Sequence, residues 1–88
     1  MIKDISILIA ALNEEESLPS LIDEINTSVQ SLNINYEIII VDDFSKKPVN
    51  SYISGKDIKV LRNSYTRGQS FSLIRAAEEA KYDFLVTL

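Results

Sequence analysis

The order of apolar runs along the chain constrains this sequence more than any other feature. Residues 5–12 are almost continuously apolar and end at a polar cluster, which is typical of a parallel strand covered on both faces. Residues 36–41 form a second such run, which ends abruptly at Asp42 and Asp43. Between the two runs, apolar residues recur at helical spacing and predict one amphipathic helix, with the stripe Leu18, Leu21, Ile22, Ile25, Val29 and Leu32.

The rest of the chain repeats this order in a shorter form. We expect an irregular connection over residues 44–57, held to the body by Tyr52 and Ile53, and a short third strand over residues 58–62. A polar turn precedes a second helix over about residues 69–81, and residues 82–88 begin a fourth strand. The residues predicted to face inward from this second helix are Phe71, Leu73, Ile74, Ala77 and Ala80.

Strands that alternate with helices at this spacing predict an α/β fold with a parallel sheet and right-handed crossovers. The expected architecture is a Rossmann-like sheet of βαβ units, with about four strands and two main helices. The 88 residues are too few for several domains, so residues 1–88 are expected to form a single one.

Composition excludes several classes of site. The chain has no Cys and no His, which excludes a disulfide scaffold, a thiolate or imidazole metal site and imidazole catalysis. No apolar run approaches the roughly 20 residues that cross a bilayer, and Asn13 to Glu16 stand where a signal peptide needs small residues. A cytoplasmic location is therefore expected.

Charge is distributed unevenly. Residues 1–45 hold nine acidic side chains against Lys3, whereas residues 46–88 hold eight basic side chains against four acidic ones. This asymmetry fits either a solvated surface with scattered charges or a site with carboxylates on one wall and cations on the other, as a nucleotide diphosphate needs. The net charge of −4, the absence of Trp and the lack of a basic stripe argue against a nucleic-acid partner.

Ligands of open parallel sheets bind beyond the carboxyl ends of the strands. That rule selects residues 12–14, residues 42–45 and whatever follows residue 88. Asp42 and Asp43 are the most informative pair, because adjacent carboxylates after a buried strand need donors, a cation or water around them. In a structural interpretation, one of the two acids caps the following turn and the other is solvated. In a functional interpretation, they accept hydrogen bonds from the base or ribose of a nucleotide, or form half of a metal site.

Two further segments have both a structural and a functional interpretation. Asn13 and Glu14 suit the entry to a helix as well as a ligand site. Arg67, Gly68 and Gln69 lie between a strand and a helix start, where backbone N–H groups and Arg suit phosphate. The sequence contains neither GxGxxG nor a Walker loop, so it indicates neither a dinucleotide fold nor a P-loop.

Taken together and in order, four segments resemble the N-terminal half of a family 2 glycosyltransferase with a GT-A fold. They are residues 7–15, residues 34–45, Val60 to Asn63 with Arg67 to Ser70, and residues 83–88. The run Asn-Tyr-Glu-Ile-Ile-Ile at residues 35–40 and the run Arg-Gly-Gln-Ser at residues 67–70 look most like the branch that transfers a sugar from a nucleotide to polyprenyl or dolichyl phosphate.

The resemblance implies transfer of a sugar from a UDP- or GDP-sugar donor, with polyprenyl phosphate as one acceptor. Base and ribose would lie against Ala10, Leu12 and Glu14. Asp43 would accept a hydrogen bond from the base. The implied nucleotide-sugar-binding set as a whole is Ala10, Leu12, Asn13, Glu14, Val41, Asp42, Asp43, Arg67 and Gln69, with Asp42 in a supporting role and Arg67 and Gln69 toward the diphosphate.

Three positions depart from the family pattern: Ala10 replaces a usual Pro, Phe44 a usual Gly, and Lys47 a frequent acidic residue. The resemblance also implies an Asp-x-Asp motif after the fourth strand, beyond Leu88, that holds Mg or Mn. Catalytic residues and metal ligands are thus expected outside this chain. We expect a donor-nucleotide half-domain that is inactive alone, self-associates through its open sheet edge, and belongs to a full-length protein with membrane association.

Two other functions fit parts of the pattern. A response-regulator receiver domain also has an acidic pair after a strand, but after its first strand, which leaves residues 5–32 unexplained. A non-catalytic nucleotide-binding module is the other alternative.

Overall fold

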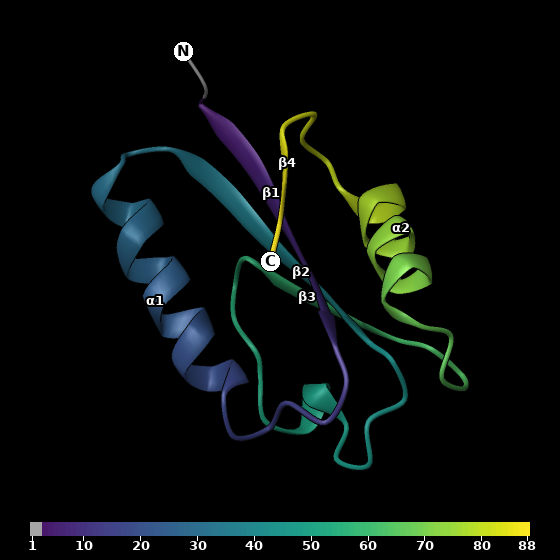
Figure 1. Cartoon of the computed structure of the whole chain (residues 1–88). Coiled ribbons are helices and arrows are strands. Elements are labelled where there is room, and N and C mark those ends of the chain that lie inside the picture. The colour runs from purple at the N-terminus through teal and green to yellow at the C-terminus, as the bar shows by residue number, and fades with distance from the viewer. Residues whose placement is uncertain (1–2) are drawn as a thin grey trace.

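The computed structural model describes residues 3–88, which form a parallel four-stranded sheet between two helices (Figure 1). The strands are β1 (Asp4–Ala11), β2 (Asn35–Asp42), β3 (Ile58–Arg62) and β4 (Leu85–Thr87). Their order across the sheet is β3-β2-β1-β4, and every neighbouring pair is parallel. This order is that of the first four strands of a doubly wound Rossmann-type sheet, so the predicted fold class is confirmed.

One helix, α1 (Leu18–Ser31), covers the larger apolar face of the sheet. Pro19 lies in its first turn, where the missing N–H costs nothing. The buried side chains of this helix are Leu18, Ile22, Ile25 and Val29, as the stripe predicts. Leu32 is the exception, because it follows the last turn and is 65% exposed. Opposite the helix lie the alternate strand residues Ile5, Ile7, Ile9, Ala11, Ile38 and Ile40, together with Val49 and Ile53.

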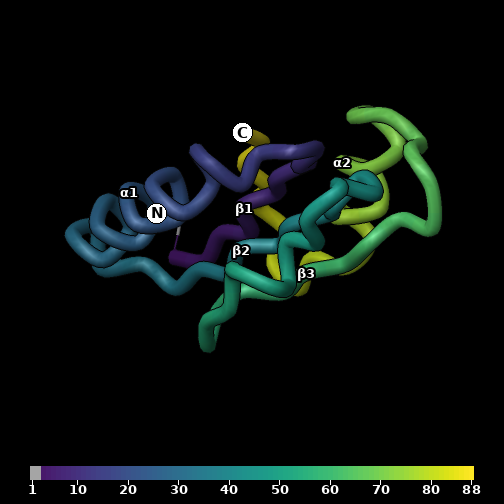
Figure 2. The backbone as a smooth tube through the Cα atoms, turned by 90° about the horizontal axis from the view of Figure 1, so that it is seen from below, coloured from purple at the N-terminus to yellow at the C-terminus, as the bar shows by residue number. Residues whose placement is uncertain are grey.

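The second helix, α2 (Gln69–Glu79), covers the other face, where the buried cluster consists of Leu8, Ile39, Val41 and Ala76. The views in Figures 1 and 2 place α1 and α2 on either side of the strands. The predicted contributions of Leu73, Ala77 and Ala80 are confirmed, since all three pack against this cluster.

The prediction that Phe71 and Ile74 face inward is wrong. Their side chains are 38% and 63% exposed, while Ser72 and Ala76 are fully buried. The helix is turned this way because the Ser72 hydroxyl accepts a hydrogen bond from Asn63 Nδ2 at 2.9 Å. Two small side chains one turn apart also let the helix lie close to the sheet.

Most predicted boundaries hold within a few residues, and β3 spans the predicted range. β1 ends at Ala11, so Leu12 lies just past the strand, and β4 is limited to three residues. The predicted connection contains one 3₁₀ turn, η1 (Val49–Ser51), and Ile53 after it is buried as expected. Over residues 3–88, none of the helices has the length and apolarity that crossing a membrane requires.

Candidate functional site

A groove of about 310 Å³ lies at the carboxyl ends of the strands. The turn after β1, the end of β2 and the connection between β3 and α2 all contribute to it. Its lining residues are Ala10, Ala11, Leu12, Glu14, Asp43, Thr66, Gly68 and Gln69. Five residues of the predicted nucleotide set are therefore brought together here, from segments far apart in the sequence: Ala10, Leu12, Glu14, Asp43 and Gln69.

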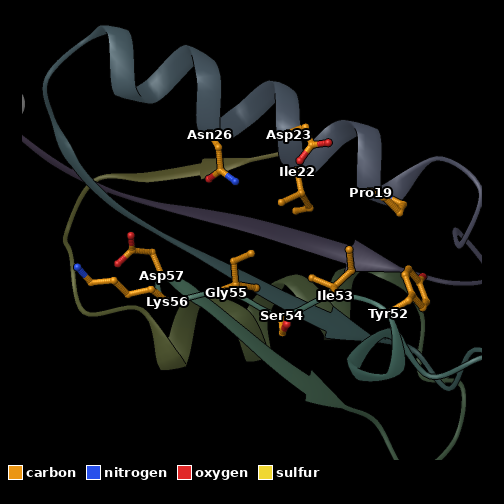
Figure 3. Close-up of a pocket in the computed structure, with 11 residues that line it drawn as sticks. Pro19, Ile22, Asp23, Asn26, Tyr52, Ile53, Ser54, Gly55, Lys56 and Asp57 are labelled. Carbon is orange, nitrogen blue, oxygen red and sulfur yellow. The ribbon is translucent and has the colours of Figure 1, made fainter.

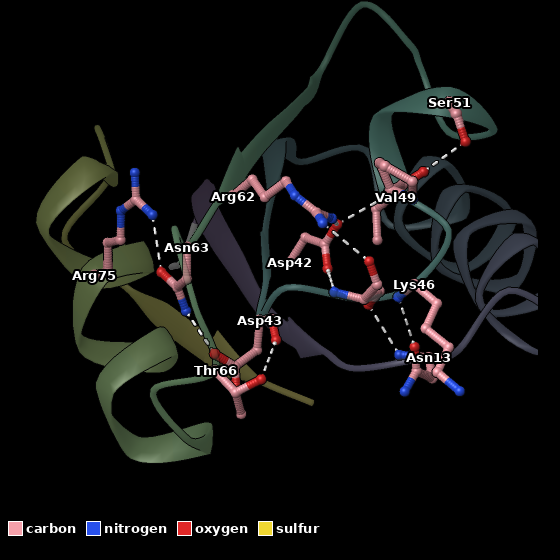
Figure 4. A network of polar contacts seen from close by, with 12 residues as sticks. Asn13, Asp42, Asp43, Lys46, Val49, Ser51, Arg62, Asn63, Thr66 and Arg75 are labelled. Atoms are coloured by element: carbon pink, nitrogen blue, oxygen red, sulfur yellow. Dashed lines mark hydrogen bonds and ion pairs between the residues drawn. The ribbon is translucent and has the colours of Figure 1, made fainter.

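Asp43 organises one wall of this groove. Its carboxylate is 4% exposed, and Oδ1 accepts hydrogen bonds from Asn63 Nδ2 at 2.9 Å and from the Arg67 backbone N–H at 2.7 Å. Oδ2 accepts from the Gly68 backbone N–H at 3.0 Å. Gly68 has φ of +98°, a conformation that favours glycine. One side chain thus fixes the shape of the connection before α2. Figure 4 shows Asp43 beside two of its partners, Asn63 and Thr66.

The ionisation of Asp43 follows from the same contacts. Burial by itself would raise the pKa of this carboxyl group, but the hydrogen bonds from Arg67, Asn63 and Gly68 stabilise the charged form and outweigh burial. The pKa of Asp43 therefore lies below its ordinary value of 3.8. The groove contains a carboxylate that is charged at neutral pH.

Asn63 connects this wall to α2 and had no role in the sequence-based site. It donates from Nδ2 to both Asp43 and Ser72, and its Oδ1 accepts from Arg75 Nη1 at 2.8 Å. Its backbone N–H also donates to the carbonyl of Asp42 at 2.8 Å. The sequence contained one signal for a role of Asn63 in the site, because it is a polar residue directly after β3, at the edge of the sheet where ligands bind.

Asp42 points to the opposite side of the sheet and is almost fully buried. Oδ1 accepts from the Ser45 backbone N–H at 2.9 Å, and Oδ2 accepts from the Val49 backbone N–H at 3.0 Å and from Arg62 Nη1 at 2.7 Å. Burial would raise the pKa of Asp42, yet the hydrogen bonds from Ser45, Val49 and Arg62 lower it below 3.8. This carboxylate stabilises the loop after β2.

Three other predicted residues lie outside the groove lining. Asn13 joins two loops, because its N–H donates to Ser45 Oγ at 2.9 Å and its Oδ1 accepts from the Lys46 N–H at 2.9 Å. Val41 is buried beneath α2. The guanidinium of Arg67 stacks on Tyr65 and Phe71, with Cζ 4.7 Å and 3.9 Å from the ring centroids. Nucleotide contacts for Asn13, Val41, Asp42 and Arg67 stay predictions.

Comparison with known proteins shows the family of the chain. Residues 6–88 match the sequence profile described as glycosyl transferase family 2. The chain belongs to this family.

Two curated relatives are transferases whose names include undecaprenyl phosphate or dolichol phosphate. An undecaprenyl-phosphate 4-deoxy-4-formamido-L-arabinose transferase of Aeromonas hydrophila subsp. hydrophila is 34% identical over 99% of this chain and 28% of its own length. A dolichol-phosphate mannosyltransferase of Pyrococcus furiosus is 34% identical over 96% of this chain and 24% of its own length. The chain therefore spans about a quarter of the length of the curated relatives it matches.

The family match and the sheet order together overturn the receiver-domain alternative. Receiver-type sheets place their first strand between the second and third, in the order 2-1-3-4-5. Here β1 lies between β2 and β4, and β3 lies at the outer edge next to β2.

Phe44 is the departure from the family 2 pattern with the clearest structural consequence. Its φ is +66°, in the left-handed region where a side chain is strained and where the family usually has glycine. The Arg62 guanidinium stacks on its ring, with Cζ 4.9 Å from the centroid. That contact and the fixed loop after Asp42 hold the strained residue in place.

Family 2 glycosyltransferases generally use divalent metals, but the residues that the structure describes do not fit one. Over residues 3–88, no three or more carboxylates gather into a cluster that would hold a cation. Asp42 and Asp43 are surrounded by N–H donors, and Asp42 is paired with Arg62. The interpretation of these two acids as half of a metal site therefore fails on their contacts.

A second groove of about 330 Å³ lies between α1 and the connection into β3 (Figure 3). It shares no lining residue with the first groove and contains none of the predicted site residues. The Tyr52 hydroxyl beside it is buried without a hydrogen-bond partner among the described residues. Burial, with the nearby charges of Glu15, Asp42 and Glu14, raises the pKa of Tyr52.

Proposed function

We propose that this chain forms the donor-nucleotide half of a family 2 glycosyltransferase that transfers a sugar from a UDP- or GDP-sugar to a polyprenyl phosphate. The observation that carries the proposal is the groove at the carboxyl ends of the strands, with a charged carboxylate in its wall and the start of α2 at its rim. The relatives named above act on undecaprenyl phosphate and dolichol phosphate, which supports the acceptor class.

In this proposal each part of the groove contacts one part of the nucleotide. Ala10 and Leu12 form the apolar wall against the base, and Asp43 accepts a hydrogen bond from it. Glu14 is exposed and its Oε2 already accepts from Ser17 Oγ at 3.0 Å, so Oε1 is free to accept from a ribose hydroxyl.

The diphosphate lies at the start of α2 beside Gln69. The first N–H groups of a helix have no partner within the helix, and the helix dipole places positive charge there. Both features favour an anion. Arg67 lies two residues before Gln69, and its guanidinium would turn from the rings of Tyr65 and Phe71 to reach the diphosphate.

The proposal assigns donor binding, and not transfer, to this chain. The metal, Mg²⁺ or Mn²⁺, and the acceptor-binding groups would belong to residues outside it. Membrane association likewise belongs to the full-length protein in this proposal.

The direct test is calorimetric titration of the chain with UDP and GDP, with and without Mn²⁺. We expect metal-independent binding of at least one nucleotide. Glu14→Gln should weaken that binding about fivefold to tenfold, because Gln keeps an acceptor oxygen but loses the charge that strengthens the hydrogen bond. Glu16→Gln is the matched control, because Glu16 is an exposed acid two residues away that does not line the groove.

Two results would overturn the nucleotide site. One is a folded chain, verified by circular dichroism, that binds neither nucleotide at millimolar concentration. The other is an equal loss of affinity in Glu14→Gln and Glu16→Gln, which would place the effect in overall charge and not in the groove.

We also propose self-association through the β4 edge. Among residues 3–88, β4 pairs only with β1, which leaves its outer backbone groups unpaired, and Leu85 beside them is exposed. Light scattering of the chain should detect dimers, and Leu85→Lys should reduce them, because it places a charge on an exposed position of this edge. A strictly monomeric chain at high concentration would contradict this expectation.

A further inference from the structure

Four hydrogen bonds form a closed polar ring beside the groove, through Asp43, Asn63, Ser72 and Gly68. Asn63 Nδ2 donates to Asp43 Oδ1 and to Ser72 Oγ, both at 2.9 Å. The Ser72 hydroxyl donates to the Gly68 carbonyl at 2.9 Å. The Gly68 N–H closes the ring by donating to Asp43 Oδ2 at 3.0 Å. The polar ring therefore joins the end of β2, the residue after β3 and the start of α2.

The orientation of the Asn63 amide is determined by its partners. An amide side chain has an oxygen that accepts and a nitrogen with two N–H groups that donate. The charged Asp43 carboxylate can only accept, whereas the Arg75 guanidinium can only donate. Arg75 Nη1 donates to Asn63 Oδ1 at 2.8 Å, on the side of the amide away from Asp43 (Figure 4). The amide nitrogen therefore faces the polar ring.

Arg75 acts on the polar ring from outside the groove. It lies in α2, three residues after Ser72, and does not line the groove. Its hydrogen bond to Asn63 is part-buried, and the Asn63 side chain itself is buried. A charged donor makes a stronger hydrogen bond than a neutral one, and it polarises the amide so that the amide N–H groups donate more strongly. The contacts of Asn63 with the polar ring thus depend on Arg75.

We propose that Arg75 is a positioning residue for the nucleotide, because it holds the Asn63 amide and, through the polar ring, fixes the rim of the groove at Gly68 and Gln69. This inference rests on the proposed function, in which the start of α2 faces the diphosphate. The polar ring holds Gly68 at φ of +98°, and Gln69, which follows it, lines the groove. Loss of Arg75 leaves Asn63 Oδ1 without its donor and loosens this rim.

The test compares the affinities of Arg75→Met, Arg75→Lys and Lys81→Met for UDP and GDP by calorimetry, with folding verified by circular dichroism. We expect Arg75→Met to weaken nucleotide binding about fivefold. Arg75→Lys keeps a charged donor on a shorter side chain and should restore part of the affinity. Lys81→Met is the matched control, because it removes the same charge from an exposed residue just after α2 whose Nζ lies over the Tyr82 ring, 5.2 Å from its centroid.

A second measurement needs no nucleotide. In proton–nitrogen NMR spectra, the Asn63 side-chain N–H signals and the Gly68 backbone N–H signal report the hydrogen bonds of the polar ring. We expect both to shift in Arg75→Met, to return toward their original positions in Arg75→Lys, and to stay in place in Lys81→Met. A loss of overall stability would not give this pattern, because the signal positions of the folded molecules do not depend on the fraction unfolded. If Arg75→Met does not fold, Arg75→Lys decides through the same signals.

The outcomes separate this inference from the proposed function. Unchanged affinity in Arg75→Met, or an equal loss in Arg75→Met and Lys81→Met, overturns the positioning role and leaves the nucleotide site intact. Unchanged Asn63 and Gly68 signals in Arg75→Met overturn it as well. Failure of the folded, unaltered chain to bind either nucleotide overturns the proposed function, and with it the role of Arg75 toward a nucleotide.

Discussion

The two faces of the sheet are built in different ways. Among residues 3–88, the face under α1 buries twelve apolar side chains in one cluster, whereas the buried cluster under α2 has four. The α2 side instead contains a network of buried polar groups, in which Asn63 donates hydrogen bonds to both Asp43 and Ser72. Apolar burial dominates on the first face, while directional hydrogen bonds determine much of the second.

The proposed site lies on the second face. Ala10 and Asp43 project from the same side of the sheet as the α2 cluster, and Gly68 and Gln69 lie directly before and at the start of α2. A groove built from polar contacts can present a charged carboxylate at a fixed position, which an apolar interface cannot. The apolar face under α1 therefore stabilises the fold, and this stability allows the face under α2 to hold buried polar groups at the site.

The largest expected change in stability compares the two faces at two neighbouring isoleucines. Ile38 lies under α1 and Ile39 on the α2 side, and both are completely buried. We expect Ile38→Ala to lower the free energy of unfolding by about 4 kcal/mol and Ile39→Ala by about 2 kcal/mol. The loss is larger at Ile38 because its side chain leaves a cavity inside the larger of the two apolar clusters. Urea denaturation measures both. Equal losses would contradict the difference between the faces.

Removal of the Asp43 carboxylate should have the next largest effect. Asp43→Ala leaves Asn63 and the N–H groups of Arg67 and Gly68 without their acceptor, and we expect a loss of about 2 to 3 kcal/mol in unfolding free energy. Nucleotide affinity should fall with it. Asp23→Ala is the control, since Asp23 is exposed on α1 and should change stability by less than about 0.5 kcal/mol. A stable Asp43→Ala variant would show that the network is dispensable.

Acid should weaken both loops that the two aspartates hold. The folded-state pKa values of Asp42 and Asp43 lie below the ordinary 3.8, so their contribution to stability is present above that pH. It is lost as pH falls from there through the lower folded values, because the unfolded chain binds protons first. Denaturation at a series of pH values should show this fall, and Asp43→Asn should flatten it. An unchanged slope in that variant would exclude Asp43 as a source.

A smaller change in stability should measure the backbone strain at Phe44, which lies in the loop after β2. Phe44→Ala removes the stack on Arg62 but keeps a side chain at φ of +66°, whereas Phe44→Gly removes both the stack and the strain. We expect the Gly variant to be more stable than the Ala variant by about 1 kcal/mol. Thermal unfolding of the pair measures this difference. A more stable Ala variant would mean that the left-handed backbone costs nothing here.

The smallest effect should come from exposed apolar residues of the two helical segments. Ile74 of α2 and Leu32 after α1 have nearly equal exposure. Substitution of either by Ser should change the free energy of unfolding by less than about 0.5 kcal/mol, because neither side chain is buried. A loss above 1 kcal/mol in Ile74→Ser alone would indicate that α2 packs more apolar surface than the structure contains.

Most of the fold could be predicted from the sequence because strand and helix periodicities are local. The strand over residues 58–62 and the buried positions of α1 follow from apolar spacing alone. The inward face of α2 did not follow, since Phe71 and Ile74 are the more apolar residues. A hydrogen bond from Asn63 to Ser72, nine residues away in sequence, sets that face, and periodicity carries no information on it.

The candidate site, like the fold, could be predicted from the sequence only in part. Asp42 and Asp43 stand out in the sequence as a pair, but nothing local separates their roles. Because side chains alternate across a strand, the two carboxylates point to opposite faces, and only the fold decides which partners each one meets. Asp42 meets Arg62 and the loop after β2, while Asp43 meets the connection before α2 and the groove.

The sequence by itself determined the parallel α/β sheet, the positions of its strands and the family, because these depend on residue types at fixed spacings. Only the tertiary structure decided which of the adjacent acids enters the groove, which donors it meets there, and which side of α2 faces the sheet. The physical reason is that hydrogen bonds join groups by distance and direction in space, and residues far apart in the chain provide both partners.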